Sequence, residues 1–273
     1  MGRDQTVAGA GRTKFKFPPV NEVVIGIRFP PIAELKAQHI GLYWDVIRER
    51  FPISDQQFPF PQVVEAAVTH VVQTAANEIF PLARFLFLSS EHPLLIQVQR
   101  DAFWVNWRRG SRTDDYPQFE AVEASFWQEV KVYKAFIESI GGKLDVVSRC
   151  ELTYVNLIGP NSLFSTSADL GKVVPSVAAF TGKPGDSMKL VGLNASATHQ
   201  VNENLFIDSS TRLGTRNDTK ELVVALELRA YGAPDGLSLE GVEPWLKSAH
   251  DSTYRVFLAL TAKGIQEQIW KPQ

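Results

Sequence analysis

The sequence predicts an α+β fold in which a curved antiparallel sheet carries long helices on one face. Extended segments follow one another with short connections, and such neighbours pair as an antiparallel meander. A long amphipathic helix follows each run of strands, and its apolar stripe needs the face of a sheet to cover it. The order of strand, helix, strands and long helix occurs twice along the 273 residues. The chain is therefore expected to consist of two similar halves.

The first half spans residues 15–144 and is expected to have the order β-α-β(4)-α. Pro18 and Pro19 open its first strand, at 22–29, because prolines fix φ and donate no backbone hydrogen bond. Apolar residues at spacings of three and four then predict a helix over 36–51. Four further strands are expected at 61–74, 82–89, 94–99 and 102–108. A longer helix follows, and its apolar stripe consists of Phe119, Val122, Phe126, Val130, Tyr133, Ile137 and Ile140.

The second half spans residues 145–273 and is expected to have the order β-α-β(3)-α. Its predicted elements are a strand at 145–158, a weak helix at 169–180 that Pro175 interrupts, strands at 188–199, 204–213 and 220–231, and a final helix at 241–263. Residues 1–14 are expected to form a disordered tail, because glycines and polar residues occur there without any period. The two halves are expected to pack as one unit that arose by internal duplication. Their element order resembles that of TATA-binding-protein-like and helix-grip folds.

Composition and charge exclude several classes of protein. Hydrophobic residues at 44% and charged residues at 21% are typical of a soluble globular chain. The net charge of −2 supplies no overall field that would gather nucleic acid. Cys150 is the one cysteine, so an intramolecular disulfide is excluded. No stretch has the pattern of a signal peptide or the roughly 18 apolar residues of a membrane span, and we expect a cytoplasmic protein.

Four motifs together resemble those of a known family. The chain carries F-x-x-P-P-V-x-E-V from Phe15 to Val23, H-I-G-L-Y-W from His39 to Trp44, L-T-Y-V-N-L-I from Leu152 to Ile158, and a C-terminal helix that ends near Trp270. With these motifs the chain resembles a sporadically distributed, uncharacterised bacterial protein family. The resemblance covers nearly the whole chain after residue 14. It implies no particular activity, but the patchy distribution of the family implies a place in a bacterial defence or toxin–antitoxin system.

The strand at 145–158 carries the polar residues that best suggest a ligand-binding site. Alternation places Arg149 and Glu151 on one face of this strand and Tyr154 and Asn156 on the other. A polar pocket beside an aromatic-rich helix would draw its ligand-binding residues from these four. The alternative is an ion pair between Arg149 and Glu151 on a solvated face of the sheet, which would contribute less than about 1 kcal/mol.

A second cluster combines aromatic rings with arginines and is a candidate partner-binding surface. It consists of Trp104, Trp107, Arg108, Arg109 and Arg112. Such residues form the hot spots of protein interfaces, and they also stack bases while neutralising phosphates. The third interpretation places the rings in the core and leaves the arginines in solvent. Alternation puts Trp104 on the face opposite to Trp107, so one large ring is expected to be exposed unless both faces are covered.

No catalytic residue, metal site or cofactor is predicted. The five histidines lack the spacing that brings two metal ligands to one face of a helix. His250, beside Asp251, is interpreted as part of a solvated helix face. Cys150 lies in a predicted strand and is interpreted as a small buried hydrophobic residue, and the sequence contains no G-x-S-x-G nucleophile motif.

Two hypotheses of function follow. The first is a non-enzymatic binding or protein-interaction protein, with a protein partner or a second copy of itself as the binding partner, set in a defence or toxin–antitoxin system. The alternative is a small-molecule-binding or enzymatic protein with a cavity between the sheet and a long helix. A deep cavity at that place would favour the alternative. Neither nucleic acid nor a membrane is expected as a partner.

Overall fold

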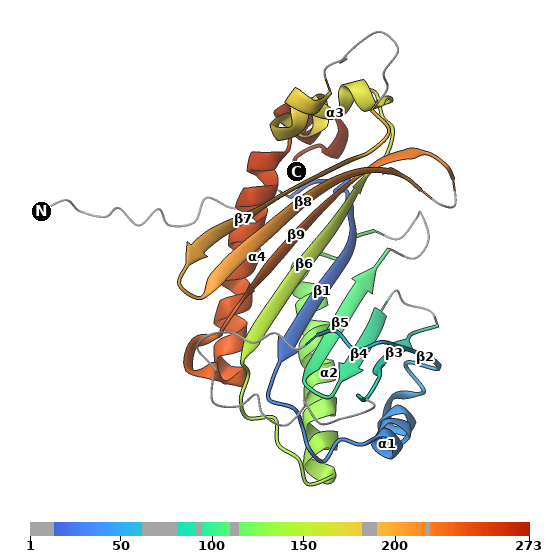
Figure 1. The fold of residues 1–273 in the computed structure, drawn as a ribbon, viewed down its shortest axis with the longest axis vertical. Helices are drawn as coiled ribbons and strands as arrows, with labels where there is room; N and C mark the ends of the chain where they lie inside the picture. The colour runs from blue at the N-terminus through green and yellow to red at the C-terminus, as the bar shows by residue number, and fades with distance from the viewer. Residues whose placement is uncertain (1–13, 62–80, 91–93, 110–114, 182–189, 217–218) are drawn as a thin grey trace, which may run out of the picture.

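The computed structural model describes residues 14–61, 81–90, 94–109, 115–181, 190–216 and 219–273. Within these residues the strands form one antiparallel sheet of nine strands, in the order β2-β3-β4-β5-β1-β6-β9-β8-β7 (Figure 1). The predicted α+β class with an antiparallel sheet is confirmed. The strands are β1 (Val20–Arg28), β2 (Ile53–Gln57), β3 (Arg84–Leu88), β4 (Leu94–Gln99), β5 (Ala102–Arg108), β6 (Arg149–Ile158), β7 (Leu193–Asn202), β8 (Leu205–Thr215) and β9 (Leu222–Gly232).

The pairing of β1 with β6 lies at the centre of the sheet and joins the two halves of the chain. In this antiparallel pair Val23 lies opposite Tyr154, and Ile25 lies opposite Leu152. On their outer sides, β1 pairs with β5 and β6 pairs with β9. Each half therefore places its first strand at the centre and its last strand next to it, so the strand order is symmetric about the central pair.

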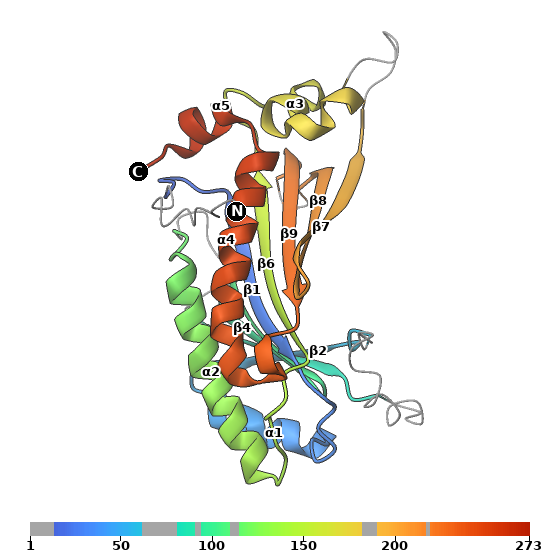
Figure 2. The same cartoon turned by 90° about the vertical axis from the view of Figure 1, so that its left-hand side faces the viewer.

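Two long helices, α2 (Phe119–Ser139) and α4 (Val242–Leu260), lie side by side against one face of the sheet (Figure 2). A third helix, α1 (Ala37–Ile47), packs at the lower end, where the ring of Tyr43 meets the rings of Phe87 and Tyr133 edge-on. Two short helices, α3 (Leu170–Val173) and α5 (Lys263–Ile265), lie at the opposite end. In the described part of the chain, no helix has both the length and the apolar composition needed to cross a membrane.

The alternation of side chains divides every central strand between two environments. Ile25, Phe103 and Leu152 point toward α2 and α4 and are fully buried in the main core. Their neighbours Gly26, Trp104 and Glu151 point to the other side, which we name the helix-free face because no helix among the described residues covers it (Figure 2). The helix-covered face is therefore apolar at this point, whereas the helix-free face carries the polar groups of Trp104 and Glu151.

Most predicted elements are present, although their ends are shifted. The predicted helix at 36–51 ends at Ile47, the predicted strand at 145–158 begins only at Arg149, and the predicted helix at 169–180 is divided at Pro175 into α3 and a 3₁₀ turn. The predicted strand at 61–74 lies outside the described residues beyond residue 61. The sequence did not predict β2, because Ile-Ser-Asp-Gln-Gln has no apolar alternation and all five residues are exposed.

A glycine is required at position 26 because the indole of Trp104 lies directly against the backbone of β1. A Cβ atom at residue 26 would lie 1.9 Å from Cδ1 of Trp104. The two residues are opposite each other in the β1–β5 pairing, and the indole N–H continues across β1 to donate a hydrogen bond of 3.0 Å to Oε2 of Glu151. The missing side chain of Gly26 thus lets a ring from one neighbouring strand reach a carboxylate on the other.

We predict that Gly26→Ala lowers the free energy of unfolding by about 1–3 kcal/mol, because the added methyl group displaces the Trp104 ring in a packed site. Gly41 in α1 is the matched control, since no atom lies within 4 Å of the position of its Cβ. Gly41→Ala should stabilise the protein by about 0.5–1 kcal/mol through the better helix propensity of alanine. Urea denaturation of both variants checks the prediction, and equal effects would contradict it.

Candidate functional site

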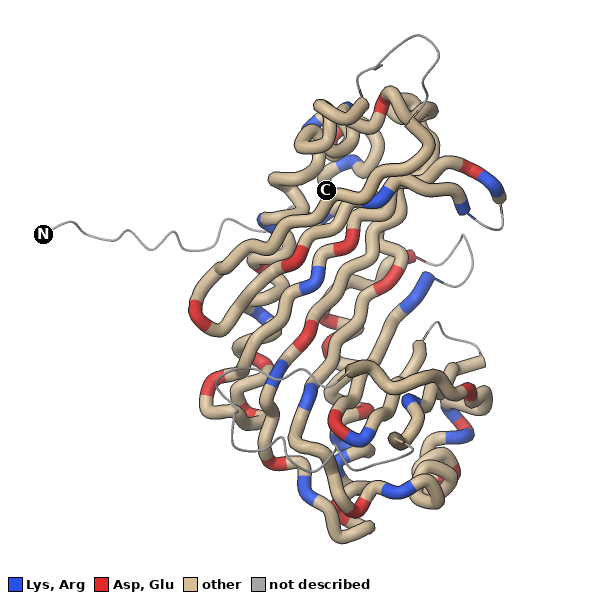
Figure 3. Tube along the Cα trace, in the orientation of Figure 1, with Lys and Arg blue, Asp and Glu red and all other residues tan. Residues whose placement is uncertain are grey.

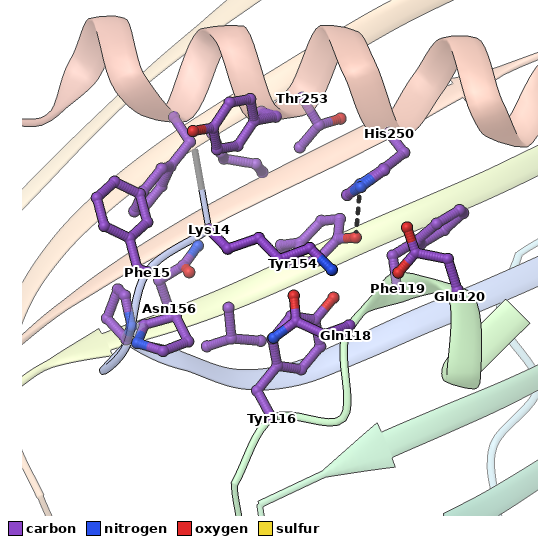
Figure 4. A pocket seen from close by; sticks show the side chains of 16 residues that line it. Lys14, Phe15, Tyr116, Gln118, Phe119, Glu120, Tyr154, Asn156, His250 and Thr253 are labelled. Carbon is purple, nitrogen blue, oxygen red and sulfur yellow. Dashed lines mark hydrogen bonds between the residues drawn. The ribbon is translucent and has the colours of Figure 1, made fainter. Parts of the chain in front are cut away.

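A pocket of about 110 Å³ opens on the helix-covered side of the sheet. It lies between α4, the start of α2, strand β6 and the segment that leads into β1 (Figure 4). For comparison, an engineered apolar cavity of about 150 Å³ holds one benzene molecule. The pocket therefore has room for several waters or for a fragment the size of a single ring.

Residues 14–19, which we name the N-terminal strap, form one wall of the pocket. Lys16 donates a backbone hydrogen bond of 2.9 Å to the carbonyl of Lys271, and Gln273 donates one of 2.7 Å to the carbonyl of Lys14. The ring of Phe15 packs edge-on against Phe257 and Trp270. Residues 1–13 of the expected tail lie outside the described residues, whereas residue 14 is part of a hydrogen-bonded wall.

The main polar pair in the pocket is Tyr154 of β6 with His250 of α4. The tyrosine hydroxyl and Nδ1 of the imidazole share a hydrogen bond of 2.9 Å (Figure 4). The imidazole also stacks on the ring of Phe119, with a centroid distance of 4.1 Å and an angle of 12° between the planes. Phe119 is the first residue of α2, so three separate elements fix the position of the imidazole.

Two further polar side chains line the pocket in a buried position. Asn156 is 2% exposed, and its amide group donates a hydrogen bond of 3.1 Å to the carbonyl of Leu226. Thr253, three residues after His250 on α4, is also 2% exposed, and its hydroxyl oxygen has no hydrogen-bond partner among the described residues. A buried hydroxyl without a partner costs about 1–3 kcal/mol. The hydroxyl oxygen itself does not face the open space of the pocket, so Thr253 lines the pocket through its other atoms.

The mouth of the pocket combines charges of both signs with an unusual backbone conformation. Lys14 extends across the opening, and Glu120 lies on its far side (Figure 4). Gln118, the residue before α2, has φ of 75° and ψ of 160°. Such a conformation costs about 1–3 kcal/mol in a residue other than glycine, and it is frequent at binding sites. Pro117 precedes Gln118, and α2 begins at Phe119, two residues after the proline.

The chemistry of the pocket suits binding better than nucleophilic catalysis. Its lining contains no cysteine and no aspartate, and His250 is its one imidazole among the described residues. The Tyr154–His250 pair can orient a polar group and exchange a proton with it, while Phe15, Phe119 and Phe257 offer apolar contact. Across the described part of the chain, no three histidine, cysteine or acidic side chains cluster to hold a metal ion.

The structure separates the four predicted ligand-binding residues onto two faces of the sheet. Tyr154 and Asn156 line the pocket. Arg149 and Glu151 point to the helix-free face, so they cannot share a site with the other two. The alternative interpretation, an ion pair on a solvated face, is also incorrect in one respect, because Arg149 is 6% exposed and Glu151 is 9% exposed.

Glu151 is the centre of a buried polar network on the helix-free face. Its Oε1 accepts a hydrogen bond of 2.9 Å from Nε of Arg28 and lies 3.4 Å from Nε of Arg149, while Oε2 accepts from Trp104. Burial alone would raise the pKa of the Glu151 carboxyl. The charge of Arg28, the hydrogen bonds from Trp104 and Arg28, and the charge of Arg149 outweigh burial, so its pKa lies below its ordinary value.

Beyond this network, the helix-free face carries alternating charges toward β7. Figure 3 shows acidic and basic residues interleaved along these strands. Arg229 of β9 pairs with Asp208 of β8 at 3.3 Å, and Arg212 of β8 pairs with Glu227 of β9 at 2.6 Å. These pairs are partly exposed, so each contributes less than about 1 kcal/mol.

The predicted partner-binding cluster does not form one surface. Trp104 is buried on the helix-free face, where Phe60 covers its ring edge-on at 5.6 Å, and Trp107 is buried on the helix-covered face beside Tyr116. Both rings are buried because both faces of the sheet are covered at this point, which agrees with the interpretation that places the rings in the core. Arg108 is exposed, Arg109 is partly buried, and Arg112 lies outside the described residues.

Sequence reasoning missed His250 and Thr253, two residues of α4 that line the pocket. His250 was interpreted as solvated, but it is partly buried between Phe119 and Tyr154. A signal was present, because Leu246, His250, Thr253 and Phe257 follow one another at spacings of four, three and four. This spacing places both polar residues on the apolar face of the helix.

Cys150 behaves as the sequence predicted. It is fully buried on the helix-covered face of β6, and its thiol is not part of the pocket lining. Burial, with a smaller contribution from the charge of Glu151, raises the pKa of the thiol far above its usual value. The thiol therefore stays protonated at neutral pH, which is unsuited to a nucleophile.

Comparison with known proteins finds no family model that matches the chain and no match among curated proteins. The resemblance to the sporadically distributed bacterial family stays a prediction from the motifs. Three of those motifs nevertheless meet in space. Phe15 and Pro19 from the first motif and Tyr154 from the third line the pocket, and Trp270 packs against Phe15.

We predict that Glu151→Gln lowers the free energy of unfolding by about 3–5 kcal/mol, because it leaves two buried guanidinium groups without their counter-charge. Glu227 is the matched control on the same face, since the side chain of its partner Arg212 is 53% exposed. Glu227→Gln should cost less than about 1 kcal/mol. Chemical denaturation at pH 7 measures both, and a small effect at Glu151 would contradict the network.

The same carboxylate should shape the acid stability of the protein. The folded pKa of Glu151 lies below the unfolded value, so the ionised carboxylate stabilises the fold above the unfolded pKa, and this stabilisation is lost as the pH falls through the folded pKa. Below about pH 4.3, the wild type should therefore lose stability more steeply than Glu151→Gln. Denaturation curves at several acidic pH values test this, and parallel slopes would refute it.

We also predict that Cys150 does not react with iodoacetamide in the native protein and reacts fully in concentrated urea. Mass spectrometry of the alkylated chain follows the reaction. Rapid alkylation under native conditions would show that the thiol is accessible and would reopen a chemical role for it.

Proposed function

We propose that the protein is a non-enzymatic binding protein that takes a small organic molecule into the pocket between α4, β6 and the N-terminal strap. The carrying observation is the hydrogen-bonded Tyr154–His250 pair, which lines this pocket beside the rings of Phe15, Phe119 and Phe257. Concave sites that combine apolar rings with a few placed polar groups are typical of small-molecule binding. A pocket between sheet and long helix is also the feature that favours a small-molecule ligand over a purely structural role.

The pocket favours a particular class of ligand. The rings of Phe15, Phe119 and Phe257 suit an apolar or aromatic body, and the volume limits this body to about one ring. The Tyr154–His250 pair suits a hydrogen-bonding group on that body. Lys14 at the mouth would favour a carboxylate or another anionic group at the outer end.

A protein-interaction role in a bacterial defence or toxin–antitoxin system is the second candidate. It is supported by the sheet, which has one face that no helix among the described residues covers and which exposes ion pairs such as Arg212–Glu227 there. Ligand binding and interaction are compatible, because the pocket and the helix-free face lie on opposite sides of the sheet. A bound ligand would then leave the helix-free face available to a protein partner.

The symmetric strand order supports the proposal that the chain arose by internal duplication and has a TATA-binding-protein-like arrangement. In both halves the first strand is central, a helix follows it, and the last strand returns to lie beside it before a long helix begins. The pocket draws its lining from both halves, since Phe119 and Glu120 belong to the first half and Tyr154 and His250 belong to the second. The halves differ most in their first helices, since α1 has 11 residues and α3 has four.

We predict that native mass spectrometry of the protein purified from its own host reveals a retained small molecule. Benzoate, phenol and indole serve as probes of the pocket in thermal-shift and ligand-observed NMR measurements. Tyr154→Phe removes the hydroxyl of the polar pair in the pocket and should weaken a hydrogen-bonding ligand by about 1 kcal/mol, or roughly fivefold in Kd.

The control for this substitution is Ser248→Ala on the exposed side of α4. It should leave both stability and binding unchanged. The proposal fails if the host protein carries no small molecule and none of the three probes binds. It also fails if Tyr154→Phe and Ser248→Ala bind a retained ligand equally well.

A further inference from the structure

The β7 edge of the sheet has the features of a strand that accepts a pairing partner. β7 has ten residues, Leu-Asn-Ala-Ser-Ala-Thr-His-Gln-Val-Asn, and it is the last strand in the sheet order. Eight of the ten residues are exposed, and Leu193 and Ala195 are half-buried. Figures 1 and 2 show the strand along the outer margin of the sheet, away from α2 and α4. The backbone groups on its outer side are therefore positioned to pair with another extended strand.

This edge lacks the usual protection against pairing. Natural edge strands are commonly short, or they carry charged residues, prolines or bulges. β7 is long, contains no Asp, Glu, Lys, Arg or Pro, and pairs with β8 without a register shift from Leu193 to Gln200. Its one irregularity lies between Gln200 and Asn202. The opposite edge differs, because β2 has only five residues and includes Asp55.

We propose that β7 pairs antiparallel with β7 of a second copy of this chain, which makes one sheet continuous through a two-fold dimer. A two-fold axis perpendicular to the sheet at Ala197 keeps the helices of both copies on the same side. Each residue then lies opposite the residue equally far from Ala197 on the partner strand. Ser196 is thus opposite the partner's Thr198, and Ala195 is opposite the partner's His199.

The sequence of β7 is self-complementary in this register. The paired side chains on the helix-free face are all polar and uncharged, namely Asn194 with the partner's Gln200 and Ser196 with the partner's Thr198. On the helix-covered face, Leu193 lies opposite the partner's Val201. Because the strand carries no charge, self-pairing places no like charges opposite each other. A closed two-fold dimer is also the commonest homo-oligomer.

A second copy suits this edge better than a charged peptide. The charged groups on the neighbouring strand opposite β7, Asp208 and Arg212 of β8, are already paired with Arg229 and Glu227. Nothing on β7 selects a cationic or an anionic strand. The proposal is independent of the pocket, because β7 contributes no residue to the pocket lining.

Sedimentation of the full chain over a range of concentrations tests the dimer. The wild type should dimerise, and Ala197→Lys should weaken the dimer by roughly tenfold or more, because the two introduced charges lie opposite each other. Gln56→Lys on the exposed β2 edge is the matched control and should leave the dimer unchanged. Circular dichroism confirms that each variant keeps the fold.

A charge exchange makes the test specific for the two-fold pairing. Ala197→Glu alone should also weaken the dimer, whereas a mixture of Ala197→Lys and Ala197→Glu should restore it through opposite charges. The proposal is overturned if the wild type is a monomer at every concentration or if Ala197→Lys leaves the dimer intact. A mixture that does not dimerise would overturn the register centred on Ala197.

Discussion

The antiparallel pairing of β1 with β6 is the constraint on which the rest of the structure depends. It is the only link in the sheet order between strands of the first half and strands of the second half, as far as the chain is described. Its register also fixes which side chains of both strands point toward the helices. A shift by one residue would exchange Cys150, Leu152 and Tyr154 with Arg149, Glu151 and Thr153. Apolar and charged residues would then both lie on the wrong side.

This register places two different kinds of polar group on opposite sides of one strand. On the helix-covered side, Tyr154 shares a hydrogen bond with His250 at the wall of a pocket. On the helix-free side, Glu151 is held between guanidinium groups and an indole. A buried charge is tolerated only with close counter-charges and hydrogen bonds, whereas a hydroxyl group can change its hydrogen-bond partner at a lower cost. The hydrogen bonds of the pocket can therefore change more easily than those of the network around Glu151.

Sequence patterns predicted the elements well because hydrophobic periodicity reports local geometry. The stripe of α2 is an example, since Phe119, Val122, Phe126 and Val130 are all buried as their spacing implied. The alternation along β6 likewise assigned Arg149 and Tyr154 to opposite faces correctly. β2 was missed because an exposed strand is held by pairing with β3 rather than by an apolar pattern.

The sites were harder to predict than the elements because they depend on contacts between distant segments. Alternation showed that Trp104 and Trp107 point to opposite faces, but it could not show that Phe60, Arg28 and Glu151 would cover the ring of Trp104. Nor could local patterns reveal that the N-terminal strap would meet α4. The arginine and tryptophan composition of 103–112 suggested one surface, although pleating distributes those residues over two faces.

The hydrogen bonds between the N-terminal strap and residues 270–273 have a consequence for synthesis in the cell. The strap is synthesised before residues 270–273, so these hydrogen bonds cannot form until the residues between them have emerged from the ribosome. The pairing of β1 with β6, its neighbour from the other half, is delayed in the same way. Contacts of such long sequence separation slow folding. The strap wall of the pocket therefore cannot form until residues 270–273 have been made.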